Sequence, residues 1–385
     1  MSLSSSTRPH VAPDMAGNLP LLNHIVPPYI QKIEAYIPSK PDDILQKMYN
    51  SPFLYRMNNN ENVIGPPQKS INAIMNFDPE RAAIYPNGDG YRLRHRLSEV
   101  FGLSSCSFII GNGANEVITF VIKAFCQKGD NIITSDKTFK VYEWVADFSG
   151  FESRLVPLKE NAFDDEGILA RIDERTKVIF ICNPNNPTGT YWNEAKLRKF
   201  MERVGGKQIV VVDEAYSEFV EQPDYPNGMN LIREYPNLVV FRTFSKMYGL
   251  AALRIGYLAG DRRVVDIIRR TCVVYSVNTL AQEAALGALG DDGTHIVRSR
   301  DLIRSSKKYL LEELDRMEFP YIAGEGNFVL IRLPISDTLA YRRLMQKGYM
   351  VRTMTGFRLP NHIRVTLHDI PVMEGFTTTL KSTIS

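Results

Sequence analysis

The chain has 385 residues, of which 44% are apolar and 23% are charged, an ordinary composition for a soluble globular protein of about two domains. Its 46 Lys and Arg residues nearly balance 43 Asp and Glu residues, so the net charge of +3 gives no reason to expect nucleic acid or a membrane as a partner. Four scattered cysteines without a C-x-x-C pair and the absence of an apolar run long enough to span a bilayer predict a cytoplasmic protein without a bound metal.

The first part of the chain predicts an arm followed by alternating helices and strands. Residues 1–35 have no clear periodicity and are interpreted as an arm. Helical spacing predicts the helices Tyr91–Phe101, Ala114–Cys126, Val141–Phe148 and Glu194–Arg203. Short apolar segments predict the strands Ser107–Ile110, Asn131–Ser135, Ser153–Pro157, Lys177–Cys182, Gln208–Val212 and Leu238–Arg242. Several of these strands are apolar at every position, which is typical of a mostly parallel sheet covered by helices on both faces.

The pattern changes after about Asn278. A long helical segment is predicted first, then a strand, a helix and a second strand, at Leu280–Met317, Asn327–Leu333, Thr338–Gln346 and His362–Leu367. This α+β pattern indicates a second, smaller domain. We therefore expect a large α/β domain over residues 66–278 and a small domain assembled from residues 36–65 and 279–385.

Ligands of open α/β sheets bind at the carboxyl ends of the strands, so the residues that follow each strand are candidates for a site. Gly111-Asn112-Gly113 follows the first strand and opens a helix, whose free N–H groups at Ala114 and Asn115 suit an anion such as phosphate. An ordinary strand-to-helix turn would explain the motif equally well. The loop Asn183–Gly189 contains two prolines and a final glycine, and such a rigid loop favours a positioned Asn side chain over a purely structural turn.

Two further loops carry charged residues. Asp213 follows a buried apolar strand and needs a cationic or hydrogen-bonding partner there, although capping the next segment is an equal alternative. Lys246 follows the strand Leu238–Arg242 among apolar and aromatic neighbours, where an amine can have the low pKa that Schiff-base chemistry needs. A single lysine is more often a solvated surface charge. Together, however, these loops offer an amine for an aldehyde, a carboxylate for a ring nitrogen and donors for a phosphate, which is the set that pyridoxal phosphate requires.

With these motifs in this order, the chain resembles the fold-type I pyridoxal-phosphate-dependent aminotransferases of class I/II, and most closely the histidinol-phosphate aminotransferase group. The resemblance runs from about Tyr36 to Thr366. It implies that Lys246 forms a Schiff base with the cofactor and later moves a proton, and that Asp213 pairs with the protonated ring nitrogen. It also implies that Asn186 and Tyr216 bond the ring oxygen.

The resemblance also implies the remaining contacts of the cofactor. Phe139 occupies the position of the aromatic residue that stacks on the ring. The cofactor phosphate would be held by Thr243, Ser245, Arg254 and the backbone N–H groups of Ala114 and Asn115. Tyr85 resembles the tyrosine that reaches the cofactor of the neighbouring subunit, which implies a homodimer with shared active sites.

On the substrate side, Arg364 matches the arginine that clamps a carboxylate with its planar fork. Asn62 belongs to an Asn-Glu-Asn signature, and Tyr36 and Arg352 stand where the histidinol-phosphate enzymes contact the substrate phosphate. Tyr36 as a packing residue of the arm and Arg352 as a surface cation are the alternatives. The chain departs from the usual pattern at Val63, commonly Pro, and at Ala252, commonly Gly.

The expected activity is transfer of an amino group, with histidinol phosphate as donor and an oxo acid such as 2-oxoglutarate as acceptor. An aminotransferase for aromatic amino acids is an alternative on the same frame, and so is a decarboxylase similar to the phosphothreonine decarboxylases. A binding or regulatory protein without catalysis is a further alternative, but it would more often have lost one of the cofactor residues.

Overall fold

The computed structural model describes residues 24–35 and 38–384, and the predicted substrate contact Tyr36 lies outside the described residues. The chain divides into two compact units, Met1–Pro38 and Ser39–Ser385. The described part of the first unit contains the short helix α2 (Pro28–Gln31). No helix in the described ranges is long and apolar enough to cross a membrane.

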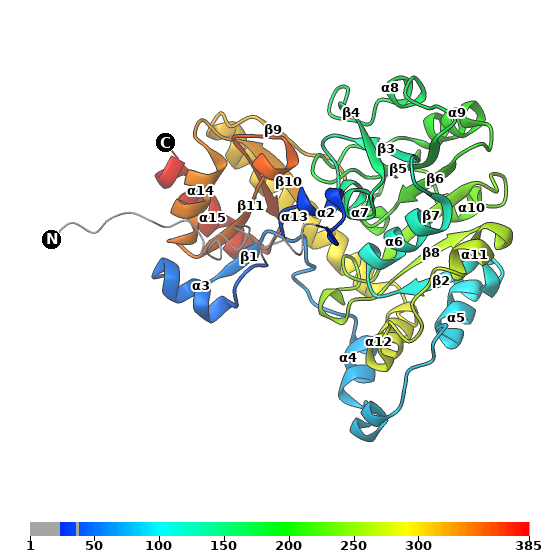
Figure 1. Cartoon of the computed structure of the whole chain (residues 1–385). Helices are drawn as coiled ribbons and strands as arrows, with labels where there is room; N and C mark the ends of the chain where they lie inside the picture. The colour runs from blue at the N-terminus through cyan, green and yellow to red at the C-terminus, as the bar shows by residue number, and fades with distance from the viewer. Residues whose placement is uncertain (1–23, 36–37, 385) are drawn as a thin grey trace. The chain divides into compact units, whose positions relative to one another are not determined.

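A seven-stranded sheet forms the centre of the larger core, in the order β2-β8-β7-β6-β5-β3-β4 (Figure 1). The strands are β2 (Phe108–Gly111), β3 (Asn131–Ser135), β4 (Glu152–Val156), β5 (Thr176–Cys182), β6 (Ile209–Asp213), β7 (Leu238–Thr243) and β8 (Gly256–Gly260). Strands β3 to β7 pair in parallel, whereas β8 runs antiparallel to β7 and β2. The interiors of β5 and β6 are buried on both faces, so the prediction of a mostly parallel sheet covered by helices is confirmed.

Helices surround this sheet and share its core, although the first and the last of those named next pack mainly on each other rather than on the sheet. They are α4 (Gln68–Met75), α5 (Tyr91–Phe101), α6 (Ala114–Phe125), α7 (Val141–Phe148), α8 (Asp165–Leu169), α9 (Glu194–Val204), α10 (Gly228–Leu231), α11 (Arg262–Arg269) and α12 (Thr279–Leu289). Helix α6 buries Val117, Ile118 and Val121, a spacing that gives one apolar face. With that face α6 packs on β2, β7 and β8, so its N-terminus lies at the edge where β7 ends.

A second sheet of five strands has its own hydrophobic cluster. Its order is β1-β11-β12-β10-β9, with β1 (Tyr55–Met57), β9 (Tyr321–Ile322), β10 (Phe328–Arg332), β11 (Tyr349–Thr353) and β12 (His362–Thr366). The accompanying helices are α3 (Asp42–Tyr49), α13 (Thr294–Arg316), α14 (Asp337–Met345) and α15 (Ile370–Ile384). This smaller α+β assembly agrees with the pattern predicted for the last part of the chain.

The prediction of one continuous helix over Leu280–Met317 is wrong. The chain instead forms α12 and α13, separated by a turn in which Gly293 has φ +93, a conformation that glycine adopts without strain. Helix α12 packs on α4 and α5 of the large core, and α13 packs on α15. The division into a large and a small domain stays a prediction, and this packing leads us to propose the turn before Thr294, rather than residue 279, as its boundary.

Candidate active site

The predicted loops meet at one edge of the seven-stranded sheet. Asp213 is the last residue of β6 and pairs with Cys182 of β5 and Phe241 of β7. The loops that follow these three strands therefore lie side by side, and the N-terminus of α6 joins them across β8. Six groups from distant parts of the sequence, described below, come together there.

Lys246 lies in the loop after β7 with its amine held in place. Its Nζ donates a hydrogen bond to Asn59 O at 2.6 Å and lies 5.8 Å from the centre of the Tyr216 ring. Burial lowers the pKa of Lys246 to about 7, and the positive charges of Arg364 and Arg254 act in the same direction. At neutral pH a large share of this amine is therefore uncharged and able to act as a nucleophile.

Asp213 is 3% exposed, and two donors fix its carboxylate. Tyr142 OH donates to Oδ2 at 2.6 Å and Ala215 N donates to Oδ1 at 3.1 Å. Burial raises the pKa of Asp213, whereas the hydrogen bond from Tyr142 lowers it. The next helical turn begins only at Ser217, so Asp213 caps no helix and presents a buried acceptor at the strand end.

A cradle for an anion lies between α6 and the loop after β7. Gly113 precedes α6 with φ +79, and a Cβ there would lie 2.4 Å from Nη2 of Arg254. Thr243 and Ser245 place two buried hydroxyls beside it, and Thr243 pairs with Gly256, which also pairs with Gly111 of β2. The N-terminus of α6 has no side-chain cap, so its first N–H groups remain for a ligand. This donor set and the space left by Gly113 fit a phosphate group.

The loop Asn183–Gly189 uses its asparagines differently. Asn185 stabilises the loop, because its amide donates to Lys137 O and Thr188 Oγ1 and its oxygen accepts from Thr138 Oγ1. Asn186 instead accepts a hydrogen bond from Nη1 of Arg364. The prolines and the glycine thus build a rigid loop, in which the buried amide of Asn186 contacts the other sheet through Arg364.

Two aromatic residues also belong to this cluster. Tyr216 is buried, accepts a hydrogen bond from Asn60 Nδ2 at 2.9 Å, and has a pKa raised to about 12 by burial. Phe139 is half-buried, and its ring meets that of Tyr142 edge-on at a centroid distance of 5.6 Å. The tyrosine hydroxyl is therefore a neutral donor, and the phenylalanine offers a ring for stacking.

Arg364 faces the site from β12 of the smaller sheet. It is 4% exposed, donates to Asn186 Oδ1 and Asn58 O, and lies 5.5 Å from the Phe328 ring. Its Nε is buried without a hydrogen-bond partner, which is rare for a charged group unless a ligand completes the site. Arg352 stands opposite Arg364 on β11, with its guanidinium 5.9 Å from the Phe357 ring.

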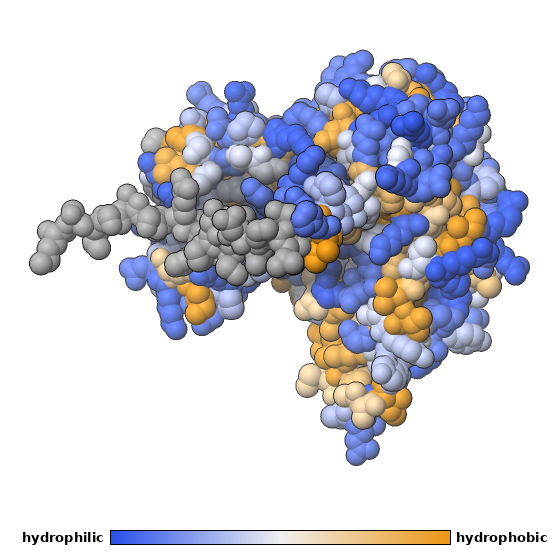
Figure 2. All heavy atoms as spheres, viewed as in Figure 1, coloured by the Kyte–Doolittle hydropathy of each residue, from blue (hydrophilic) through white to orange (hydrophobic). Residues whose placement is uncertain are grey.

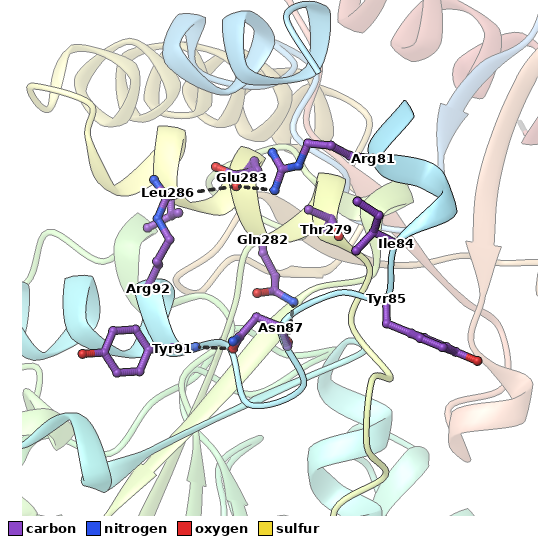
Figure 3. Close-up of a pocket in the computed structure, with 10 residues that line it drawn as sticks. All are labelled: Arg81, Ile84, Tyr85, Asn87, Tyr91, Arg92, Thr279, Gln282, Glu283 and Leu286. Carbon is purple, nitrogen blue, oxygen red and sulfur yellow. Dashed lines mark hydrogen bonds and ion pairs between the residues drawn. The ribbon is translucent and has the colours of Figure 1, made fainter. Parts of the chain in front are cut away.

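Asn62 and Tyr85 are not part of the cluster described above. Asn62 Nδ2 donates to Met247 O at 2.7 Å and Ser299 Oγ at 2.9 Å, so it ties α13 to the residue after Lys246. Tyr85 is 81% exposed and stacks on Tyr275 at a centroid distance of 5.0 Å. Its ring points away from the other labelled side chains of a surface cavity of about 210 Å³ (Figure 3).

Three groups that were not predicted as site residues contact the predicted ones. Tyr142 bonds Asp213, Asn60 bonds Tyr216, and the carbonyl of Asn58 bonds Arg364. A sequence signal existed for Tyr142, an aromatic residue three positions after Phe139 at the start of the predicted helix Val141–Phe148. Asn60 belongs to the Asn-Glu-Asn signature, but only Asn62 of that signature was predicted as a site residue. Asn58 gave no signal, because a short strand end shows no periodicity.

Comparison with protein families and curated proteins gives consistent matches. Residues 55–379 match the family described as aminotransferase class I and II. The histidinol-phosphate aminotransferase 2 of Pseudomonas fluorescens is 36% identical over 342 residues, which is 88% of this chain and 92% of that protein. The histidinol-phosphate aminotransferase of Moorella thermoacetica is 34% identical over 357 residues, or 92% of each chain.

Solved structures show the same fold. The histidinol-phosphate aminotransferase from Sinorhizobium meliloti, in complex with pyridoxal-5'-phosphate, aligns with a TM-score of 0.82 and 23% identity, over 93% of this chain and 96% of that one. The enzyme of that name from Clostridium acetobutylicum aligns with a TM-score of 0.77 and 26% identity, over 85% and 98%.

Proposed function

Because the chain belongs to the class I and II aminotransferases and uses pyridoxal phosphate, we propose that it transfers the amino group of histidinol phosphate to 2-oxoglutarate. The observation that carries this proposal is the pair Arg352 and Arg364, which leave the same face of the smaller sheet at the site. Two arginines suit substrates that bring a phosphate or carboxylate. Relatives named for this donor, at about 35% identity, support the same choice.

Each of the groups proposed to hold the cofactor has its own role. When bound, pyridoxal phosphate supplies an aldehyde that takes up the amino group and a ring that withdraws electrons from the carbon bearing it. Its phosphate would be held by Thr243, Ser245, Arg254 and the N–H groups of Ala114 and Asn115. Phe139 would pack against the ring, and Asn186 and Tyr216 would bond its oxygen.

Lys246 and Asp213 take part directly in the proposed reaction. Lys246 Nζ is the amine that holds the cofactor between turnovers, and its pKa of about 7 makes it able to release and take up protons at neutral pH. Its amine would also remove the proton from the carbon that carries the substrate's amino group. Asp213 would accept a hydrogen bond from the ring nitrogen of the cofactor and so favour its protonated form.

A homodimer with shared sites accounts for the exposed apolar surface around Tyr85. Met75, Ile84, Tyr85, Val274 and Tyr275 are all at least half exposed. Figure 2 shows apolar surface gathered at the lower part of the view, where α4 and α12 lie in Figure 1. Surfaces of this kind mark protein interfaces, and in such a dimer Tyr85 reaches the cofactor phosphate of the partner subunit. A cytoplasmic location stays a prediction.

A spectral titration tests the proposed donor. Purified protein loaded with pyridoxal phosphate is mixed separately with histidinol phosphate, glutamate, aromatic amino acids and phosphothreonine, and the visible band of the cofactor is followed. We expect histidinol phosphate and glutamate to remove the band rapidly and 2-oxoglutarate to restore it. Conversion by aromatic amino acids alone would show that the donor is an aromatic amino acid rather than histidinol phosphate. Release of carbon dioxide from phosphothreonine would show that the reaction is a decarboxylation rather than an amino transfer. Lys246→Ala is the control without the amine.

A further inference from the structure

A hydrogen bond behind the site links two buried side chains that lie far apart in the sequence. Tyr142 OH donates to Asp213 Oδ2 at 2.6 Å, and the two side chains are 0% and 3% exposed. A buried hydrogen bond between a hydroxyl and a carboxylate is among the stronger kinds in proteins, because the acceptor is ionised and the surroundings are apolar.

The Tyr142 ring is fixed in place by its neighbours. It stacks on Phe180 of β5 with a centroid distance of 4.8 Å and an interplanar angle of 12°, and it meets Phe139 edge-on at 5.6 Å and 82°. The hydroxyl therefore has little freedom to leave Asp213. Because Ala215 N binds the other carboxylate oxygen, Tyr142 and Ala215 together set the orientation of the carboxylate.

We propose that Tyr142 is a positioning residue that orients the Asp213 carboxylate and keeps it ionised, so that the ring nitrogen of the bound cofactor retains its proton. This inference rests on the proposed role of Asp213 and extends it to a residue on α7 that does not itself touch the ring nitrogen. Removing the hydroxyl leaves one carboxylate oxygen without its donor, and the more basic carboxylate then competes with the ring for the proton.

The charges around Asp213 agree with this effect. Burial and the nearby Glu214 raise the pKa of Asp213, whereas Tyr142, Ala215 and the charge of Lys246 lower it, and Tyr142 is the largest of these lowering effects. Burial raises the pKa of Tyr142 itself well above its usual range. The hydroxyl therefore remains a neutral donor throughout the pH range in which the enzyme works.

The test uses the loaded enzyme with pyridoxal phosphate labelled with ¹⁵N in the ring. The ¹⁵N chemical shift reports directly whether the ring nitrogen is protonated. We expect the wild type to give the protonated signal and Tyr142→Phe to move it toward the neutral value, with kcat lowered roughly ten-fold or more while KM changes little. Tyr225→Phe is the matched control, because it removes a tyrosine hydroxyl from Asn183 O without touching Asp213.

A second substitution protects the test against a folding defect. Incorporating 3-fluorotyrosine at position 142 preserves the ring and makes the hydroxyl a stronger donor, so this variant should keep the protonated ¹⁵N signal of the wild type. A Tyr142→Phe enzyme that also keeps the protonated signal would overturn the proposal, as would an equal shift in Tyr225→Phe. A neutral ring nitrogen in the wild type would instead refute the role of Asp213 in the proposed function.

Discussion

Arg352 of β11 and Arg364 of β12 are directly paired across two antiparallel strands, so their side chains leave the same face of the sheet. Like charges at such positions repel each other, and burial together with the charge of Arg352 lowers the pKa of Arg364 to about 10. A bound anion relieves this repulsion. The arrangement therefore favours substrates that bring negative charge to this face.

The first prediction concerns the choice of substrate. Replacing Arg352 with Met removes one cation from this face and leaves the contacts of Arg364 in place. We expect KM for histidinol phosphate to rise roughly ten-fold or more, as the loss of a charge-assisted hydrogen bond implies, with a smaller rise for an aromatic amino acid. Steady-state kinetics with both donors measure the difference. Arg304→Met, which removes an exposed arginine paired with Glu221, is the control, and equal KM changes for both donors in Arg352→Met would contradict the prediction.

The second prediction follows from the pKa of Lys246. This amine is charged below a pH of about 7 and uncharged above it, and only the uncharged amine attacks an aldehyde. The rate at which the cofactor-free protein takes up pyridoxal phosphate should therefore rise with pH through about 7 and then level off. Rapid mixing between about pH 5 and pH 9 measures this rate. A rate that still rises steeply at the upper end of this pH range would show that the pKa of Lys246 is not lowered.

The third prediction concerns the phosphate cradle. Gly113→Ala places a Cβ against the Arg254 guanidinium and strains a backbone with φ +79, so affinity for pyridoxal phosphate should fall by at least ten-fold. Gly129→Ala is a close control, because Gly129 has φ +92 but no atom within 4 Å of the added Cβ. Both variants should lose some thermal stability. Cofactor binding measured by fluorescence should fall only in Gly113→Ala, and equal losses in both would show that backbone strain alone matters.

The fourth prediction concerns stability rather than catalysis. Arg242 donates through Nε and Nη2 to Oε2 of Glu214 at 2.9 and 2.8 Å, and the Glu214 side chain is fully buried. Arg242→Met leaves that carboxylate buried without its partner and should lower the free energy of unfolding by about 3–5 kcal/mol. Burial already raises the pKa of the Glu214 carboxyl. Without Arg242 this carboxyl binds a proton more tightly in the native state than in the unfolded state, so the loss of stability grows as pH rises.

Chemical denaturation at several pH values measures this loss. Arg270→Met breaks an exposed ion pair with Asp266 and should change the free energy of unfolding by no more than about 0.5 kcal/mol. The double variant Arg242→Met with Glu214→Gln should recover part of the loss, since the side chain at position 214 then carries no charge. A loss no larger than that of Arg270→Met would mean that water reaches Glu214.

The sequence predicted the parallel core of the fold well, because a strand that is buried on both faces is apolar at every position. Strand β3 and helices α5 and α7 were predicted with the bounds that the structure shows. Strand β8 was missed, since its sequence Gly-Tyr-Leu-Ala-Gly is short and bounded by glycines. The break between α12 and α13 was missed as well, because apolar spacing continues on both sides of the turn.

At the site, the residues that could be identified from the sequence are those that follow a strand. The order of the strands in the sheet determines where such residues lie. Asp213, Lys246 and the loop with Asn186 all lie at the shared edge for that reason. Contacts that join separate elements were not predictable in this way. The bond from Tyr142 to Asp213 depends on how α7 packs over β3 and β4, and the contacts of Arg364 depend on how the two sheets approach each other.

The groups proposed to hold the cofactor and those proposed to select the substrate lie mostly on different sheets, each with its own buried cluster. Changes in the two clusters should therefore affect stability independently, except where they meet. Donor preference can then diverge during evolution through substitutions on β11 and β12 while cofactor chemistry is inherited unchanged. Directed evolution toward a new amine should begin on those two strands, because variants there remain loaded and can be screened by colour.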